Sequence, residues 1–193
     1  EEEALQEEME SEQTSEGLNV TIDDVNYTIQ AAISEEMLPD GCVKTTSTFN
    51  GQPVEAALFE KGGLTLLYAV MQGEEEEEGD FFIYNETNGK LQFFIQLRSI
   101  ENRFIVPIAA QESQPAQFKA ERMQWNNSFV PAYVLEDSSI ENGDAFFLLY
   151  AVSNEGEKGF YLYDTMEGTY QRFLNYTGAQ ATSATIGTGM EKK

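Results

Sequence analysis

An internal duplication constrains this chain more than any other feature of its sequence. The apolar run L-L-Y-A-V occurs twice, at residues 66–70 and 148–152. An acidic turn follows each run, and then an aromatic-rich segment, F-F-I-Y-N-E-T-N-G-K-L-Q-F-F or G-F-Y-L-Y-D-T-M-E-G-T-Y-Q-R-F. Aromatic and β-branched runs separated by turn residues are typical of strands and hairpins. The duplication therefore predicts two copies of one β unit, at about residues 49–96 and 125–176.

The hairpin turns of the two copies match each other most closely. Asn85 and Asp164 begin these turns, and Gly89 and Gly168 come four residues after them. An Asn or Asp side chain can accept a hydrogen bond from the backbone two residues further on. Glycine adopts the positive φ that closes a type I turn with a G1-type bulge. These four residues are therefore expected to have a structural role in the turns.

The whole pattern predicts a mostly β, antiparallel domain over residues 18–177. Alternating apolar and polar residues at 18–33 predict an N-terminal hairpin. We expect two duplicated four-stranded units, related by a pseudo-twofold axis and packed as a sandwich or open barrel, each supplying half of one core. Residues 1–17 are rich in Glu and residues 178–193 in small polar residues, which predicts an acidic flexible linker and a flexible tail.

The composition excludes several classes of function. The chain has 34 acidic and 11 basic residues, and a net charge of −23 repels nucleic acid and anionic lipid heads. It has no histidine, which removes Ser-His-Asp triads, most zinc enzymes and most haem sites. The single cysteine, Cys42, allows no internal disulfide and is expected to be a small buried residue. No apolar run approaches the ~18 residues that span a membrane, so this segment is not expected to insert in one. No cofactor is expected either.

Aromatic and amide side chains supply the candidate ligand-binding residues. Trp125 stands where the first copy has a Phe, and Tyr133 stands where it has an Ala. Such rings can stack on the apolar faces of sugars, although aromatic residues of a β protein more often belong to its core. Gln92 and Gln171 recur at matching positions, where they either satisfy a backbone group or line a groove.

Acidic residues supply a candidate cation site. Glu74, Glu75 and Glu76 belong to a run of five glutamates between Gly73 and Gly79. Calcium needs six to eight oxygen ligands at defined spacing, and five consecutive glutamates fit no calcium-loop pattern. A solvated hairpin tip is the alternative interpretation. A pair of carboxylates could also hydrolyse a glycosidic bond, but the sequence singles out no such pair and no catalytic residue.

Short motifs resemble two groups of known proteins. The Tyr-Asp-x-x-x-Gly hairpin is similar to that of kelch-type propeller blades, although the diglycine and Trp of those blades are absent. Most of residues 18–176 resembles uncharacterised extracytoplasmic β-repeat domains of Gram-positive gut bacteria, in which a Glu-rich linker precedes the domain. The matching residues are Tyr27 to Ile29, Leu38 to Gly41, Asn50 and Gly51 with Ala56, and Tyr84 with Asn85 or Tyr163 with Asp164. The resemblance implies a membrane-tethered protein of unknown role and carries over no catalytic residue.

These observations favour a non-enzymatic extracytoplasmic interaction or sensor module of a secreted or membrane-tethered protein. Its partner is expected to be a cell-envelope glycan or protein, held between the two copies. The first residue is Glu1 and not Met, so we expect a mature or trimmed product from which a signal or anchor has been removed. The alternative is a carboxylate-based enzyme or binding module acting on cell-envelope polysaccharide, which an acidic pair with raised pKa in a cleft would favour. A structural spacer without any groove is the third interpretation.

Overall fold

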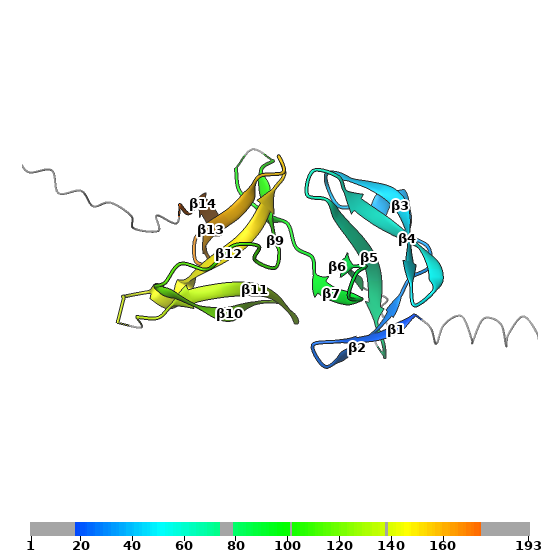
Figure 1. The fold of residues 1–193 in the computed structure, drawn as a ribbon, viewed down its shortest axis with the longest axis horizontal. Coiled ribbons are helices and arrows are strands. Elements are labelled where there is room, and N and C mark those ends of the chain that lie inside the picture. Colours follow the sequence, from blue (N-terminus) through cyan, green and yellow to red (C-terminus); the bar gives the residue numbers. More distant parts are fainter. Residues whose placement is uncertain (1–17, 74–78, 101, 138, 175–193) are drawn as a thin grey trace, which may run out of the picture.

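The computed structural model of the protein describes residues 18–73, 79–100, 102–137 and 139–174. They form two antiparallel sheets of seven strands each, consistent with a β-sandwich, which confirms the predicted fold class (Figure 1). Two short 3-10 helices, η1 (Glu35–Met37) and η2 (Gly143–Ala145), are the helical elements of these residues. No helix in this part of the chain is long and apolar enough to cross a membrane.

The first sheet, blue to green in Figure 1, is organised around strand β5. Its strands are β1 (Asn19–Ile22), β2 (Val25–Ile29), β3 (Cys42–Phe49), β4 (Gln52–Phe59), β5 (Leu64–Met71), β6 (Gly79–Asn85) and β7 (Lys90–Phe93). One edge of β5 pairs with β6, and the other edge pairs with β4 at its start and with β2 at its end. The N-terminal hairpin predicted from the sequence is β1 and β2.

The second sheet repeats this connectivity around strand β12. Its strands are β8 (Leu97–Arg98), β9 (Phe104–Pro107), β10 (Phe118–Trp125), β11 (Ser128–Leu135), β12 (Phe146–Ser153), β13 (Lys158–Asp164) and β14 (Thr169–Arg172). One edge of β12 pairs with β13, and the other pairs with β11 and then with β9. A backbone hydrogen bond recurs as well. The N–H of Cys42 donates to the carbonyl of Pro39 in the first copy, and the N–H of Phe118 donates to the carbonyl of Pro115 in the second.

The duplicated unit is therefore larger than the sequence predicted. Four strands were expected in each copy, and these are β4 to β7 and β11 to β14. The structure adds β1 to β3 to the first copy and β8 to β10 to the second. The sequence predicted the β1–β2 hairpin but not that it belongs to the duplicated unit. It concealed β8 because that strand has only two residues, and the edge strands β3 and β10 because they are mostly polar.

The two matched hairpin turns share one geometry. Asn85 Oδ1 accepts the N–H of Thr87 at 3.0 Å, and Asp164 Oδ1 accepts the N–H of Met166 at 2.9 Å. Gly89 and Gly168 have φ of 69° and 66°, which most other residues would adopt only with strain. The side-chain acceptor and the glycine together hold each turn closed.

Both sheets contribute to a common core, which has two clusters. Alternate residues of β12 enter different clusters, since Leu149 and Ala151 belong to one and Leu148 and Val152 to the other. All four of these side chains are fully buried. Each cluster contains residues of both sheets, so the copies share the core. The central strands are thus buried on both faces, which accounts for their continuous apolar runs.

Matched aromatic pairs hold each sheet in a curl. The rings of Phe49 on β3 and Tyr84 on β6 are 5.6 Å apart, although these strands are not hydrogen-bonded neighbours. Their counterparts Trp125 and Tyr163 are 6.5 Å apart on β10 and β13. Tyr84 also donates its hydroxyl to the carbonyl of Thr48 at 3.2 Å. These contacts draw the edge strands β3 and β10 towards the hairpins that contain β6 and β13.

The two sheets meet head to tail, and the predicted pseudo-twofold axis is wrong. Gln92 of the first sheet donates its side-chain N–H to the carbonyl of Pro107 in the second. The counterpart of Gln92 in the second copy is Gln171. The counterpart of Pro107 in the first copy is Ile29, because Ile29 pairs with β5 as Pro107 pairs with β12. A twofold axis would therefore bring Gln171 into contact with Ile29. Gln171 is instead exposed. The duplicated units therefore use different surfaces to contact each other.

Truncation of the central strand tests this description of the core. Leu149→Ala should lower the free energy of unfolding by about 2–5 kcal/mol, because it leaves a cavity in a fully buried site. Ile100→Ala should change it by less than about 0.5 kcal/mol, because that side chain is 83% exposed. Urea unfolding of the two variants measures both, and equal losses would contradict the assignment of the core.

Candidate binding groove between the two sheets

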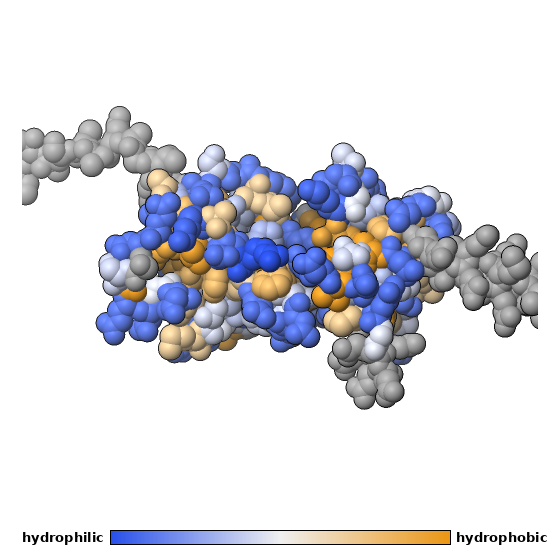
Figure 2. All heavy atoms as spheres, turned by 90° about the horizontal axis from the view of Figure 1, so that it is seen from below, coloured by the Kyte–Doolittle hydropathy of each residue, from blue (hydrophilic) through white to orange (hydrophobic). Residues whose placement is uncertain are grey.

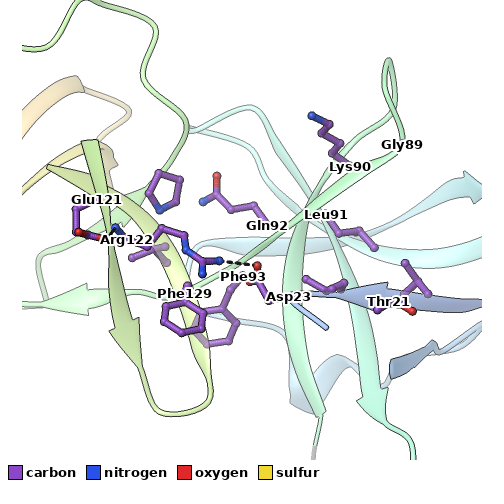
Figure 3. Close-up of a pocket in the computed structure, with 14 residues that line it drawn as sticks. Thr21, Asp23, Gly89, Lys90, Leu91, Gln92, Phe93, Glu121, Arg122 and Phe129 are labelled. Atoms are coloured by element: carbon purple, nitrogen blue, oxygen red, sulfur yellow. Dashed lines mark hydrogen bonds and ion pairs between the residues drawn. The ribbon is translucent and has the colours of Figure 1, made fainter. Parts of the chain in front are cut away.

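A hollow of about 540 Å3 lies where the two sheets meet (Figure 3). Strand β1, the turn that follows it and strand β7 line it from the first sheet, and β10 and β11 line it from the second. Figure 2 shows strongly hydrophilic residues between the two halves of the molecule, with apolar residues to either side. Neither sheet forms the hollow alone, and we call it the inter-sheet groove.

An ion pair crosses the inter-sheet groove. Asp23 Oδ1 and Arg122 Nη1 are 2.8 Å apart, and Figure 3 shows the two side chains meeting from opposite sheets. Asp23 and Asp24 both have positive φ, as in the type I′ turns that join short hairpins. This turn places Asp23 at the tip of the hairpin, opposite β10. The pair is about half exposed, so solvent screens it and it sets geometry more than stability.

Arg122 also stacks on an aromatic ring. Its guanidinium carbon lies 4.3 Å from the centre of the Phe129 ring, within the range of a cation–π contact. The contact fixes the guanidinium plane in the groove. Lys90 contributes a second positive charge, and Figure 3 shows its side chain at the rim. Two acidic residues, Asp23 and Glu121, line the same hollow, so side chains of both charges face it.

The structure separates the two predicted glutamines. Gln92 lines the inter-sheet groove, and its Nε2 donates to the carbonyl of Pro107 at 3.0 Å, which ties the sheets together. Gln171 lies on the exposed part of β14, outside this groove. Gln92 thus satisfies a backbone group and lines a groove, which were the two alternatives that the sequence left open.

The two predicted aromatic residues are also separated. Trp125 packs on Tyr163 and lines a smaller hollow of about 220 Å3, also between the sheets. Tyr133 instead packs on Phe160, with ring centres 6.0 Å apart, and lines neither hollow. Both rings are partly buried against the core clusters, which agrees with the alternative that they belong to the scaffold.

The smaller hollow contains a further contact between the sheets. Tyr27 of β2 and Ser128 of β11 line it and are joined by a side-chain hydrogen bond. Burial raises the pKa of Tyr27, and the Ser128 hydrogen bond opposes this shift.

The predicted cation site lies outside the described residues. Glu74, Glu75 and Glu76 are not among them, so this site remains a prediction. Within the described ranges, no group of three or more Cys, Asp or Glu side chains is close enough to hold a metal ion.

Carboxyl groups of the described residues lie at the surface. The buried polar residues there are Ser47 and Ser128, and no Asp or Glu is among them. Hydrogen bonds lower the pKa of three surface carboxyls. Glu55 accepts a hydrogen bond from Lys44, Asp137 from Ser139 and Glu155 from Lys61. A general acid needs the opposite shift, which burial produces.

Comparisons with protein-family models, curated proteins and solved structures gave no match. The function of the groove is therefore inferred from its geometry and chemistry.

Sequence reasoning missed Asp23, Arg122 and Phe129 as groove residues. The signal that would have found Arg122 is the difference between the copies, because its counterpart on β3 is Thr46. That comparison requires β3 and β10 to be recognised as duplicated strands.

The two glutamines form a matched test of the contact between the sheets. Gln92→Ala should lower the free energy of unfolding by about 1–3 kcal/mol, because it leaves the Pro107 carbonyl without its donor. Gln171→Ala should change it by less than about 0.5 kcal/mol, because Gln171 is exposed. Thermal unfolding of both variants measures the difference, and a larger effect at Gln171 would contradict the head-to-tail contact.

Cys42 gives a second test, by its reactivity. Cys42 is partly buried and not fully buried as predicted. This burial, with a smaller effect of Asp40, raises the pKa of the Cys42 thiol to about 11. Because the thiolate is the reactive form, the native protein at pH 8 should react with a disulfide reagent at least about tenfold more slowly than the urea-unfolded chain. Equal rates would show that the thiol is neither buried nor shifted.

Proposed function

We propose that this chain is a non-enzymatic extracytoplasmic interaction module that binds a cell-envelope glycan in the inter-sheet groove. The observation that carries the proposal is the groove itself, which needs both copies and presents a ring-stacked guanidinium in an otherwise strongly acidic protein. A duplicated fold that binds at the junction of its copies has a binding site that neither copy has alone.

The side chains of the groove suit an acidic saccharide. Lys90 and Arg122 provide positive charge for a sugar carboxylate, and Arg122 offers the planar fork that such groups accept. Thr21 and Glu121 offer partners for sugar hydroxyls. Phe129 provides an apolar surface beside these polar groups. A carboxylate of the ligand would share Arg122 with Asp23, so ligand binding and the ion pair are coupled.

The carboxylate-based enzyme is less well supported. Asp23 and Glu121 are the two acidic residues that line the groove, and both are exposed. Asp23 is also held in the ion pair with Arg122. A glycoside hydrolase needs one carboxyl that keeps its proton, which requires a buried or apolar setting. Acidic residues at a turn and on an exposed edge strand fit a binding module better.

The extracytoplasmic location is supported by sequence alone. Residues 1–17 contain a Glu-rich stretch of the kind that precedes the β-repeat domains that this chain resembles. The sensor role and the membrane tether are parts of the same proposal.

A ligand screen of the 193-residue chain tests the proposal. Oligosaccharides that contain uronic or muramic acid should raise the melting temperature by about 5 °C at one hundred times their dissociation constant, and neutral analogues should not. Lys90→Ala should weaken this binding at least about fivefold, because it removes an unpaired rim cation. Lys158→Ala is the control, since Lys158 lies outside the groove and should leave binding unchanged. A shift with neutral glycans only, or equal effects of both variants, would overturn the proposal.

A further inference from the structure

The smaller hollow, beside Trp125, has an aromatic lining that comes from both sheets. Tyr27 of β2 and Phe93 of β7 line it from the first sheet, and Trp125 of β10 lines it from the second. Tyr27 is 3% exposed and Phe93 is 8% exposed, so these two rings are almost completely removed from bulk water. Met71 adds a thioether to the same lining. We call this hollow the aromatic hollow.

The charge at the aromatic hollow is negative. Asp80 of β6 lines it, and among the residues that the structure describes no Lys or Arg does. Burial is the largest cause of the raised pKa of Tyr27, and the negative charges of Asp80 and Asp23 raise it further. Two carboxylates thus act on the space beside the Tyr27 hydroxyl. The inter-sheet groove differs in this respect, because side chains of both charges line it.

The second copy places a cation of its own on the corresponding surface. In the matched hairpins Phe93 corresponds to Arg172, and Asp80 corresponds to Gly159. The guanidinium carbon of Arg172 lies 5.1 Å from the centre of the Tyr161 ring. A Cβ atom on Gly159 would collide with Arg172 Nη2, so the glycine makes room for this cation. The first copy has a ring and a carboxylate at these two positions, which indicates that a cation from outside could take the place of the guanidinium.

The size and the lining of the aromatic hollow limit the kind of cation. Its volume of about 220 Å3 is below the range of about 300–1,000 Å3 for sites of drug-sized molecules. A primary ammonium group carries three N–H donors, and each needs an acceptor once it leaves water. A trimethylated ammonium group has no such donor, and its charge is attracted to aromatic rings, most strongly where these are desolvated. The lining therefore suits a small trimethylated cation.

We propose that the aromatic hollow binds a small organic cation with a trimethylated ammonium group. The ammonium group lies among Tyr27, Phe93 and Trp125, and Asp80 supplies the opposite charge. Asn127, which also lines the hollow, offers an amide to a polar substituent of the cation. The proposal does not depend on the glycan proposal, because its ligand has the opposite charge and the two linings share only Phe93.

Choline and its neutral isostere, neopentylcarbinol, test the proposal on the full chain. In the isostere a carbon atom replaces the quaternary nitrogen, so the two molecules have nearly the same shape and differ in charge. Trp125 is the only tryptophan of the chain, so its fluorescence reports on the hollow directly. Choline should change this fluorescence saturably and bind at least about tenfold more tightly than the isostere.

Three outcomes of this titration would overturn the proposal. Equal affinity for choline and neopentylcarbinol would mean that the hollow recognises apolar shape alone. A saturable response to glucose but not to choline would mean that Trp125 belongs to a site for neutral sugars. The third is that none of these molecules binds.

Two aspartate variants form a matched pair of equal charge. Asp80→Asn should weaken choline binding at least about fivefold in calorimetric titrations, because it removes the carboxylate of the hollow. Asp144→Asn should leave the affinity unchanged, since Asp144 is also exposed and lies outside the hollow. Equal losses in the two variants would mean that the net charge of the chain attracts choline, which contradicts a site at Asp80.

Two aromatic variants form a second pair. Trp125→Leu should weaken choline binding at least about tenfold in the same calorimetric titrations, because it removes one of the three rings. Tyr133→Leu should not weaken it, since Tyr133 is partly buried like Trp125 but lines neither hollow between the sheets. If Trp125→Leu does not fold, the aspartate pair decides the question. Full affinity for choline in a folded Trp125→Leu protein would overturn the proposal.

Discussion

Both sheets depend on one constraint: a single edge of the central strand pairs with two different strands. β5 uses one edge for β6 and divides the other between β4 and β2, and β12 does the same with β13, β11 and β9. A strand that pairs with three others lies at the centre of its sheet and is covered on both faces. Its middle residues are apolar on both faces, which is why L-L-Y-A-V shows no alternation. The curl, the common core and the contact between the sheets follow from these two buried strands.

The sequence predicted the central features and not the peripheral ones. The runs at β5 and β12 and their hairpins were recognisable because buried strands and glycine-containing turns leave a strong residue pattern. The edge strands β3 and β10 were not, because half of each faces solvent and its residues can diverge. The head-to-tail contact was also beyond the sequence, since it joins residues such as Gln92 and Pro107 that belong to different strands of different copies.

The candidate site was predictable only in part. Gln92 was recognised because it recurs in both copies, and the structure places it in the inter-sheet groove. Gln171 recurs equally and lies outside that groove, because an asymmetric contact gives equal residues unequal surroundings. The longer second loop was visible as a difference in length, but the hollow beside it arises from the lost pairing of β11 with β12. Duplication thus predicts a scaffold well, and departures from it produce the hollows on its surface.

The asymmetric contact between the copies also bears on assembly. Like units that meet head to tail can in principle add a third unit, and then further ones, because the contact does not close on itself. In this chain the surface that would receive another unit has changed. Thr46 and Glu55 stand on the first sheet where the second has Arg122 and Pro131, so the partner of Asp23 is missing there. A further unit that met the first copy in the same way would therefore lack the ion pair that joins the two copies of this chain.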